Sequence, residues 1–372
     1  MSDLSLYEKY GLKQVINASG KMTILGVSTL QEEVLLSMKE GATKFFEIKD
    51  LLDKTGAYIA KTLNIESAYI VSSASAGIAM TIASLISKDN LDMILNLHSR
   101  KYNVPREVIL PKGHNVDYGC PVQTMIELGG GLLKEAGYSN QCKKEHVETL
   151  INENTIALMY VKSHHCVQKG IVSIEELVEL GRKYNLPVII DAAAEEDLRK
   201  YYNLGVDVVI YSGAKAIEGP TSGLVIGKKK YIDLIKLQSQ GIGRAMKVGK
   251  ENILGLAKAI ELYENSIKIT GEELNKRLES FINTLNNIKG IEASSIKDAA
   301  GRDIVRGQLS FNSDILGLEA KDIVKKLKDG PIAIYTRDYR ANEGKIEIDI
   351  RSVSHEELKI IENRIIEIIG GK

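Results

Sequence analysis

One lysine directly follows an apolar run in the segment Val209-Ile-Tyr-Ser-Gly-Ala-Lys215-Ala-Ile-Glu-Gly-Pro-Thr-Ser-Gly223. Small residues precede Lys215 and a Gly-Pro pair follows it, which predicts a strand, a tight turn and then a loop. An earlier apolar run, Leu186-Pro-Val-Ile-Ile-Asp191, ends in a carboxylate. We expect both runs to be strands of one sheet, so that Lys215 and Asp191 leave it at related positions.

This combination of lysine and aspartate is the one that pyridoxal 5'-phosphate (PLP) chemistry requires. The lysine amine holds the cofactor aldehyde as a Schiff base. The aspartate keeps the pyridine nitrogen protonated, so that the ring can accept electrons from a substrate carbanion. The alternative is that Lys215 is an ordinary surface lysine and Asp191 an ordinary helix N-cap.

The composition is that of a soluble globular protein, with 372 residues, 44% apolar and 26% charged. Lys and Arg together number 49, as do Asp and Glu, so charge gives no case for nucleic-acid or membrane binding. Cys120, Cys142 and Cys166 form neither a disulfide framework nor a zinc motif. The N-terminus does not read as a secretory signal, and no apolar run reaches the ~20 residues of a membrane span. We therefore expect a cytoplasmic protein without a metal.

Apolar runs and helical periodicity alternate along the first two thirds of the chain. Strands are expected at 68–72, 93–97, 107–110, 155–161, 186–191 and 207–211, and helices at 31–61, 76–87 and 174–184. This order predicts an α/β fold with a mostly parallel sheet covered on both faces. Further on, helices at 249–288, 320–327 and 355–369 alternate with strands at 306–311, 332–335 and 345–351. We expect an N-terminal arm and large domain over 1–248 and a smaller α+β domain over 249–372.

Small residues in Ser72-Ser-Ala-Ser-Ala-Gly77 join an expected strand to a helix N-terminus. Such a turn lets Ser73, Ala74 and Ser75 approach a phosphate, aided by the helix dipole, and Ser212 can add a hydroxyl. The alternative is an ordinary serine N-cap. The segment has neither the dinucleotide nor the P-loop glycine pattern, so it favours a single phosphate such as that of PLP.

Histidines follow two of the expected strands. Ser163-His-His-Cys166 offers one histidine, for which we choose His165, to the cofactor ring, because adjacent residues of an extended segment point in opposite directions. His114 and Tyr118, after the strand at 107–110, are further candidates for ring or substrate contacts, although loop residues of this kind are usually just solvated. A metal site at His164, His165 and Cys166 is disfavoured, because three consecutive residues rarely chelate one tetrahedral ion.

Basic residues near the end of the large domain and in the small domain are candidates for binding an anionic substrate. Gly241-Ile-Gly-Arg244-Ala-Met-Lys247-Val-Gly-Lys250 is either a flexible hinge or a grip for a substrate phosphate. Arg351 is a candidate for a bidentate contact with a substrate carboxylate, and Arg337 and Arg340 are its competitors.

With these residues laid out, the chain resembles the fold-type-I PLP enzymes related to bacterial selenocysteine synthase, and among them the D-glucosaminate-6-phosphate ammonia-lyase branch. The resemblance covers nearly the whole chain and is carried by Val15-Ile-Asn-Ala-Ser-Gly20, Ser73-Ala-Ser-Ala-Gly77, Pro111-Lys-Gly-His-Asn115, Ser163-His-His-Cys-Val-Gln-Lys169, Asp191-Ala-Ala-Ala-Glu-Glu196, Ser212-Gly-Ala-Lys-Ala-Ile-Glu-Gly-Pro-Thr-Ser-Gly223 and Gly243-Arg-Ala-Met-Lys-Val-Gly-Lys250. It implies Lys215 as the Schiff-base lysine, Asp191 as the pyridinium partner and residues 73–75 as the phosphate loop. It also implies a homodimer or higher homo-oligomer, with Thr221 near a neighbour's cofactor.

The function that this resemblance implies is removal of ammonia from a small phosphorylated amino-sugar acid, with Lys215 and Asp191 as the catalytic residues. Compared with selenocysteine synthases the chain is short and is expected to lack the region that grips tRNA. Two alternatives stay open. One is a selenium transferase or another PLP-dependent β-eliminating lyase, and the other is a non-catalytic, PLP-binding structural oligomer.

Overall fold

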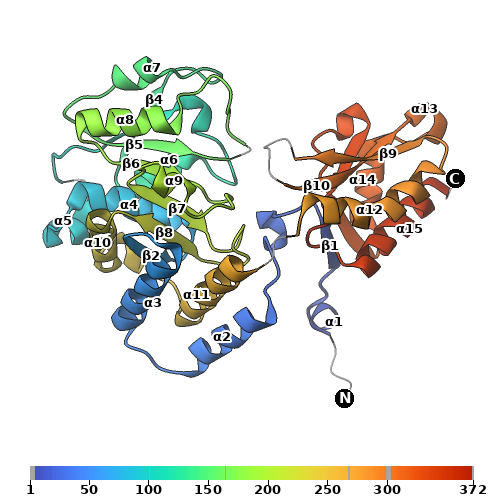
Figure 1. Cartoon of the computed structure of the whole chain (residues 1–372), viewed down its shortest axis with the longest axis horizontal. Helices are drawn as coiled ribbons and strands as arrows, with labels where there is room; N and C mark the ends of the chain where they lie inside the picture. Colours follow the sequence, from blue (N-terminus) through green and yellow to red (C-terminus); the bar gives the residue numbers. More distant parts are fainter. Residues whose placement is uncertain (1–4, 100, 164, 267–268, 299–302, 371–372) are drawn as a thin grey trace. The chain divides into compact units, whose positions relative to one another are not determined.

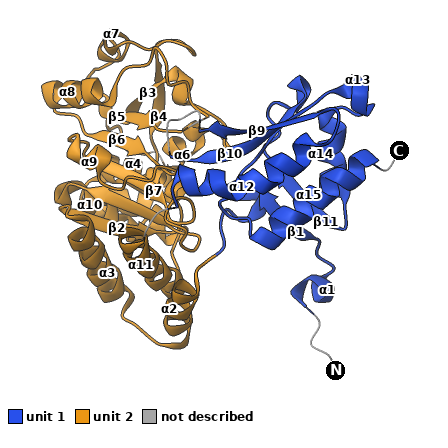
Figure 2. Cartoon of the chain, turned by 45° about the vertical axis from the view of Figure 1, so that its right-hand side comes forward, with its two compact units in different colours: residues 1–29, 267–372 blue, residues 30–266 orange. Residues whose placement is uncertain are grey.

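The computed structural model describes residues 5–99, 101–163, 165–266, 269–298 and 303–370 (Figure 1). The chain divides into two compact units (Figure 2). Unit 1 combines Met1–Thr29 with Ile267–Lys372, and unit 2 is Leu30–Ser266.

This division differs from the expected boundary at 248/249 for two reasons. Strand β1 (Gln14–Ala18) pairs in parallel with β11 (Ile332–Thr336), which ties the N-terminal segment to the C-terminal unit. Helix α11 (Lys250–Asn265) packs against α2 (Glu32–Thr43) and α3 (Ile48–Leu63), and therefore belongs to unit 2. Both partners lie more than 180 residues away along the chain, so local composition does not reveal them.

Unit 2 is built on a seven-stranded sheet with the strand order β2-β8-β7-β6-β5-β3-β4. Its strands are β2 (Ser67–Val71), β3 (Glu107–Pro111), β4 (Leu132–Ala136), β5 (Thr155–Val161), β6 (Val188–Asp191), β7 (Val208–Ser212) and β8 (Gly223–Gly227). β8 is antiparallel to both of its neighbours, and all pairings from β7 across to β4 are parallel. The expected mostly parallel sheet is confirmed.

The central strands are apolar at nearly every position because both faces of the sheet are buried. Val209 and Tyr211 of β7 enter one hydrophobic core, and Val208 and Ile210 enter the other. Besides α2, α3 and α11, the helices of unit 2 are α4 (Ala74–Ser87), α5 (Leu91–Asn96), α6 (Val122–Leu128), α7 (Lys144–Glu148), α8 (Ile174–Tyr184), α9 (Lys200–Asn203) and α10 (Lys229–Leu237). Residues of α4, α5, α6 and α10 line the core that contains Val208, and residues of α3, α8 and α11 line the other.

The strand expected at 93–97 is wrong, because this segment forms α5. The Asn90 side chain caps the helix by accepting the N–H of Met93 at 3.0 Å. Met93, Ile94 and Leu97 are buried, which is the spacing of one helix face. A five-residue apolar run is too short for its periodicity to separate strand from helix. The helical stretches expected at 31–61 and 249–288 are each two helices: α2 with α3, and α11 with α12 (Gly271–Asn286).

Unit 1 is a smaller α+β unit, as expected for the C-terminal region. Its antiparallel sheet has the order β12-β10-β9, with β9 (Ile291–Lys297), β10 (Val305–Phe311) and β12 (Lys345–Ile348). Its helices are α1 (Leu6–Tyr10), α12, α13 (Ser313–Leu316), α14 (Ala320–Asp329) and α15 (His355–Gly370). Short 3-10 helices lie in both units. Those of unit 1 are Thr23–Leu25 and Ala341–Glu343, and those of unit 2 are Leu97–Ser99, Lys112–His114, Gln238–Gln240 and Ile242–Arg244. Within the described ranges, no helix is both long and apolar enough to cross a membrane.

Candidate active site

The carboxyl ends of several strands in unit 2 meet at one edge of the sheet. Ser212, at the end of β7, pairs with Gly223, which starts β8, and Gly223 also pairs with Val71 at the end of β2. β6 and β5 run parallel to β7, so Asp191 and Val161 end at the same edge. Open α/β sheets bind their ligands there. The segments that leave this edge carry Ser73, Tyr118, His165, Asp191 and Lys215.

Lys215 lies in a tight turn that links β7 to β8. Its N–H donates to the carbonyl of Ser212 at 3.4 Å, and its carbonyl accepts the N–H of Glu218 at 3.2 Å. The N–H of Gly213 donates to the Ser222 carbonyl at 2.8 Å, and a Cβ on Gly213 would lie 2.1 Å from the Ser222 hydroxyl oxygen. A glycine is therefore required at position 213, two residues before Lys215, because the returning chain passes so close to it. The Lys215 side chain is partly buried.

Asp191 ends β6 and is only 6% exposed. Its Oδ1 accepts the N–H of Ala193 at 3.1 Å. Burial raises the pKa of this carboxyl, because the charged form loses solvation, while the Lys215 ammonium and the Ala193 N–H oppose the rise. Lys215 and Asp191 are thus within electrostatic reach of one another. A buried carboxylate with a raised pKa beside a lysine is typical of functional sites.

Helix α4 begins at the same edge, where the Ser73 hydroxyl caps it by accepting the N–H of Ala76 at 3.0 Å. The ordinary N-cap anticipated as the alternative is therefore present. Gly223 passes so close that a Cβ on it would lie 2.5 Å from the Ser73 carbonyl carbon and 2.8 Å from the Ala74 nitrogen. Ser73, Ala74, Ser75 and Ser212 remain partly exposed, so the helix N-terminus stays accessible to an anion.

His114 does not have the geometry of a ligand-contacting residue. It is fully buried, its Nδ1 accepts the N–H of Val161 at 3.4 Å, and its Nε2 lies 3.0 Å from the Val167 carbonyl oxygen. Its ring packs edge-on against Tyr160 at 4.2 Å between centroids. Burial lowers the pKa of His114 to about 4, so the ring is a neutral donor and acceptor between two backbone groups. These contacts show that His114 joins two loops of the core, and its expected contact with the cofactor stays a prediction.

His165 is exposed after β5, and its backbone N–H donates to the Ser163 hydroxyl at 3.2 Å. Its neighbour His164 lies outside the described residues. Burial, and then the Asp191 charge, raise the pKa of the Cys166 thiol to about 12, which keeps it protonated and unsuited to metal binding. Within the described residues, no group of three or more His, Cys, Asp or Glu side chains is placed to hold a metal.

Tyr118 places a buried hydroxyl beside this edge. The hydroxyl has no hydrogen-bond partner of normal geometry among the described residues. Burial raises its pKa to about 12, with the Ser75 hydroxyl opposing the rise and the Asp191 charge adding to it. The Tyr118 hydroxyl is therefore within electrostatic reach of Ser75 and Asp191, and it is a candidate for a ligand contact.

The basic segment after α10 divides into two groups. The side chains of Arg244 and Lys247 are exposed, and neither has a hydrogen bond or ion pair among the described residues, although the Arg244 backbone N–H donates to the Gly241 carbonyl at 3.0 Å. The Lys250 ammonium instead donates to the carbonyls of Ala42, at 3.2 Å, and Lys44 at the end of α2. Lys250 thus has a structural contact that competes with its expected role. Close by, the side chain of Asn252 donates to the carbonyl of exposed Thr221 at 2.9 Å.

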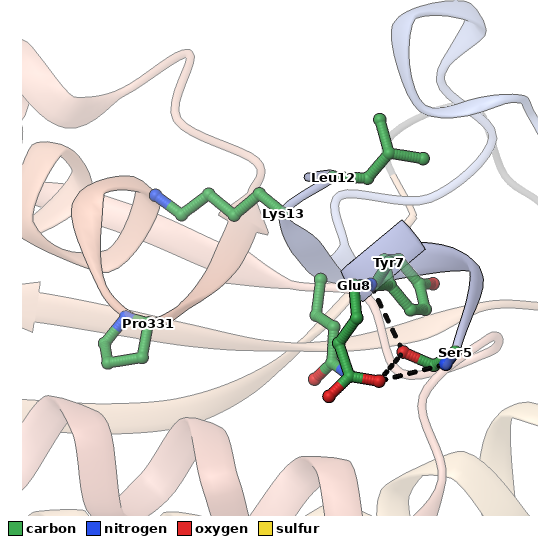
Figure 3. A pocket seen from close by; sticks show the side chains of 7 residues that line it. Ser5, Tyr7, Glu8, Leu12, Lys13 and Pro331 are labelled. Carbon is green, nitrogen blue, oxygen red and sulfur yellow. Dashed lines mark hydrogen bonds between the residues drawn. The ribbon is translucent and has the colours of Figure 1, made fainter. Parts of the chain in front are cut away.

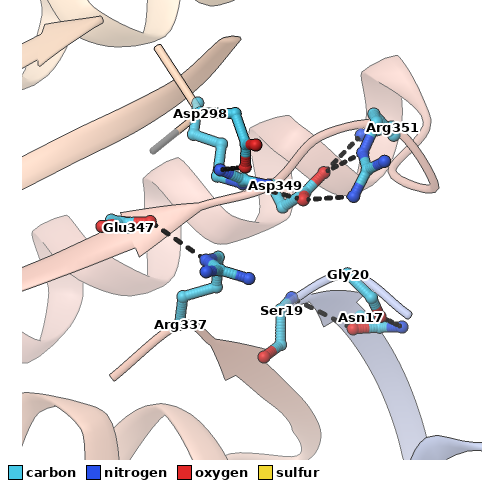
Figure 4. Close-up of polar contacts among 9 residues, drawn as sticks. Asn17, Ser19, Gly20, Asp298, Arg337, Glu347, Asp349 and Arg351 are labelled. Carbon is cyan, nitrogen blue, oxygen red and sulfur yellow. Dashed lines mark hydrogen bonds and ion pairs between the residues drawn. The ribbon is translucent and has the colours of Figure 1, made fainter. Parts of the chain in front are cut away.

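Arg351 and Arg337 belong to unit 1, and each is paired with a carboxylate (Figure 4). Arg351 donates from Nε and Nη2 to the two oxygens of Asp349, both at 2.9 Å. Arg337 donates from Nε to Glu347 at 3.0 Å. Neither carboxylate was predicted as a partner from the sequence, although the charged Asp349 between two isoleucines was a signal for one of them.

A separate surface pocket of about 340 Å³ lies in unit 1 (Figure 3). It is lined by Ser5, Tyr7, Glu8, Leu12, Lys13, Gln14 and Pro331. None of these residues was a candidate from the sequence, and the pocket includes no group suited to PLP chemistry beyond one exposed lysine.

The residue types at the sheet edge of unit 2 fit PLP. A protonated pyridine nitrogen would stabilise the buried Asp191 carboxylate, whose raised pKa shows that its charge is poorly compensated. A phosphate is compatible with the α4 N-terminus and the hydroxyls around it. Lys215 supplies the amine that the cofactor aldehyde requires.

Comparisons with known proteins agree with this arrangement. The family model described as SelA: L-seryl-tRNA selenium transferase matches residues 15–281. A relative from Salmonella typhimurium (strain 14028s / SGSC 2262), named D-glucosaminate-6-phosphate ammonia lyase, is 45% identical over 98% of both chains. A Streptomyces relative, named 5'-C-glycyluridine monooxygenase-decarboxylase, is 34% identical over 98% of this chain and 92% of its own.

A solved structure of D-glucosaminate-6-phosphate ammonia-lyase matches the fold with a TM-score of 0.93, at 44% identity and 99% coverage of both chains. The extent of these matches exceeds what a shared fold alone would give. The chain therefore belongs to the SelA family of fold-type-I PLP enzymes, in the branch of D-glucosaminate-6-phosphate ammonia lyase.

Proposed function

We propose that this protein is a PLP-dependent ammonia lyase that converts 2-amino-2-deoxy-D-gluconate 6-phosphate to 2-dehydro-3-deoxy-6-phosphogluconate and ammonia. The observation that carries the proposal is the buried Asp191, with its raised pKa, within electrostatic reach of Lys215 at the carboxyl edge of a parallel sheet. The name of the Salmonella relative supports the choice of substrate.

PLP, when bound, supplies an aldehyde that condenses with amines and a ring that accepts an electron pair. Asp191 would hold a proton on the ring nitrogen through its charge. Lys215 would tether the cofactor. Ser73, Ala74, Ser75 and Ser212 would bind its phosphate, with His165 and Tyr118 as contacts to the ring or substrate and Thr221 serving a neighbouring subunit.

Lys215 has a second task in this proposal. With the substrate bound, the Lys215 amine would act as general base and accept the proton from Cα. The C3 hydroxyl then leaves as water. One water is added back when the C–N bond is hydrolysed, so the net change is loss of ammonia. Arg244 and Lys247 would bind the substrate phosphate, with Lys250 a weaker candidate, and Arg351 rather than Arg337 would bind its carboxylate.

The direct test is ammonia release from the amino-sugar acid phosphate by the wild-type protein and by Lys215→Ala. We expect Lys215→Ala to lower turnover by about 10³-fold or more, because it removes both the tether and the base. Borohydride reduction should fix PLP to the wild-type chain and not to the variant. A matched control is Lys228→Ala, which removes a lysine near an aspartate at the opposite edge of the same sheet: Nζ of Lys228 lies 2.7 Å from Asp207. This control should keep its turnover.

Three results would contradict the proposal. If the wild-type protein neither binds PLP nor turns yellow with it, PLP is not its cofactor. Protein that binds PLP but releases no ammonia would favour a non-catalytic structural oligomer. Formation of a selenocysteinyl product from seryl-tRNA and selenophosphate would favour the transferase activity named by the family model.

We also propose that the protein works as a cytoplasmic homo-oligomer. Its three cysteines are free thiols, as is usual in a reducing compartment. Large apolar side chains are exposed around the connection of α2 and α3, with Phe45 fully exposed and Leu36 and Ile48 about half exposed. Such a cluster is typical of an interaction surface, and a second copy of the chain is the partner that this family implies.

A further inference from the structure

The loop that follows Asp191 receives hydrogen bonds from three tyrosine hydroxyls. This loop, residues 192–197, leads from β6 towards α9 through turns and bends, and its last three residues are acidic. Each of these three residues accepts one tyrosine hydroxyl. The bonds run from Tyr201 of α9 to the Glu195 carboxylate at 2.5 Å, from Tyr263 of α11 to the Glu196 carbonyl at 2.5 Å, and from Tyr211 of β7 to the Asp197 carbonyl at 3.2 Å. The loop is thus tied to two helices and one strand of unit 2.

The three tyrosine rings are packed into the protein, so they cannot follow a moving loop. Tyr201 and Tyr211 are each 1% exposed within one hydrophobic core, and Tyr263 packs against the same core. Burial raises the pKa of all three hydroxyls, which therefore stay protonated and able to donate at neutral pH. Because these anchors are uncharged, they hold the loop without neutralising the nearby charge of Asp191.

Backbone hydrogen bonds connect the anchored part of the loop to the Asp191 carboxylate. The Glu195 N–H donates to the Ala192 carbonyl at 3.0 Å. The next residue, Ala193, donates its N–H to Oδ1 of Asp191 at 3.1 Å. The Ala193 carbonyl accepts the N–H of Ser212, at the end of β7, at 3.2 Å. The peptide that orients the carboxylate is therefore fixed between the anchored loop and the strand beside it.

We propose that Tyr201, Tyr211 and Tyr263 are positioning residues: through the loop at 192–197 they hold the Asp191 carboxylate in the orientation that binds the ring nitrogen of PLP. This inference rests on the proposed function for the identity of the cofactor. A loop without regular structure would otherwise have to be ordered when the cofactor binds, and the lost conformational entropy would weaken binding. The tyrosines order the loop in the folded chain, so the ring nitrogen meets a carboxylate whose position is already set.

The test compares two cofactors that differ only at the ring nitrogen. In 1-deazapyridoxal 5'-phosphate a carbon replaces this nitrogen, while the aldehyde and the phosphate are unchanged. We expect the PLP-free wild type to bind PLP about 10- to 100-fold more tightly than the analogue in absorbance titrations, the usual size of a charge-assisted hydrogen bond. Asp191→Ala should abolish this preference. Tyr201→Phe and Tyr263→Phe should each reduce it by about 3- to 10-fold without changing the affinity for the analogue. Tyr211→Phe removes the longest of the three bonds and should have the smallest effect.

The residue next to Tyr201 on α9 provides a matched control. The Tyr202 hydroxyl accepts the backbone N–H of Glu66 at 3.3 Å, so Tyr202→Phe should leave the preference at the wild-type value. A double variant separates positioning from general structure. If Tyr201 acts through Asp191, adding Tyr201→Phe to Asp191→Ala changes neither affinity further. Tyr263 is less buried than Tyr201, so Tyr263→Phe supplies the measurement if Tyr201→Phe does not fold.

Several outcomes would overturn the inference. A preference that is absent from the wild type, or that survives Asp191→Ala, would show that the carboxylate does not bind the ring nitrogen. An unchanged preference in Tyr201→Phe and Tyr263→Phe would show that the hydroxyls do not position it. Equal weakening of both cofactors by these changes would show a structural effect only, as would a further loss in the double variant.

Failure of the proposed function is distinguishable from failure of this inference. A wild type that releases no ammonia, but whose preference for PLP depends on the tyrosines, would contradict the function and support the inference. A wild type that releases ammonia and binds both cofactors equally would support the function and overturn the inference.

Discussion

Two buried aspartates, Asp191 in unit 2 and Asp349 in unit 1, have pKa values that are shifted in opposite directions. Each follows or ends a strand, and each is at most 6% exposed. Burial raises the pKa of Asp191, with only the Lys215 charge and one backbone N–H opposing the rise. Burial also acts to raise the pKa of Asp349, but Arg351 and Arg306 outweigh it and lower the pKa to about 2. The difference lies in the neighbours and not in the residue or its depth.

The two carboxylates therefore differ in what they require: charges of the chain itself compensate Asp349, whereas Asp191 is only partly compensated. Asp349 has two guanidinium partners within 3.0 Å and needs nothing from outside the chain. Asp191 leaves part of its desolvation cost unbalanced, which a cationic ring nitrogen would offset. Removing one partner of a buried ion pair is strongly destabilising, because the other charge is left uncompensated, whereas buried carboxylates with shifted pKa values are typical of functional sites.

The largest expected effect comes from removing each charge in turn. Asp349→Asn should lower the free energy of unfolding by about 3–5 kcal/mol, because it leaves the buried Arg306 undercompensated. Asp191→Asn should not destabilise the PLP-free protein, because it removes a charge that burial disfavours, yet it should abolish most turnover. Urea unfolding of both PLP-free variants measures the contrast. Equal destabilisation by the two changes would show that the two aspartates do not differ in charge compensation.

His114 is a third buried titratable group to set beside the two aspartates. Its hydrogen-bond partners are backbone atoms of Val161 and Val167. Its pKa is about 4 in the folded protein and 6.5 without burial, so the unfolded chain binds more protons between these values. Stability should therefore fall by up to about 3 kcal/mol as the pH drops from 6.5 to 4. His114→Gln should lose this part of the pH dependence in urea unfolding, whereas His355→Gln, at an exposed position, should keep it. The same slope in all three proteins would contradict the assignment.

The smallest expected effect is the acid response of Asp349. Because its folded pKa is lowered, its stabilisation is complete above pH 3.8 and is lost as the pH falls towards 2. Wild-type protein should lose about 2 kcal/mol more over this interval than Asp349→Asn. Asp191 has the opposite sign, so Asp191→Asn should not reduce the loss. Unfolding measured at pH 4, 3 and 2 tests this, and a loss of equal size in Asp349→Asn would contradict it.

Local patterns predicted the strands that carry the site. The runs at 186–191 and 207–211 are apolar at almost every position, which only a sheet buried on both faces explains, and both are strands. Prediction failed at 93–97, where the run was too short to show a period. The compact units divide at other positions than the expected boundary, because the pairing of β1 with β11 and the packing of α11 on α2 join distant parts of the chain.

The amino-acid order was sufficient to single out Lys215 and Asp191, since a strand, a turn and a terminal carboxylate are features of adjacent residues. It was not sufficient for His114, whose partners Val161 and Val167 lie some fifty residues away, nor for Lys250, which reaches Ala42. The pairing of Asp349 with both Arg351 and Arg306 likewise depends on the folded arrangement, because Arg306 comes from another strand. A side chain's chemistry is set by what touches it, and contacts between distant residues exist only after the chain has folded.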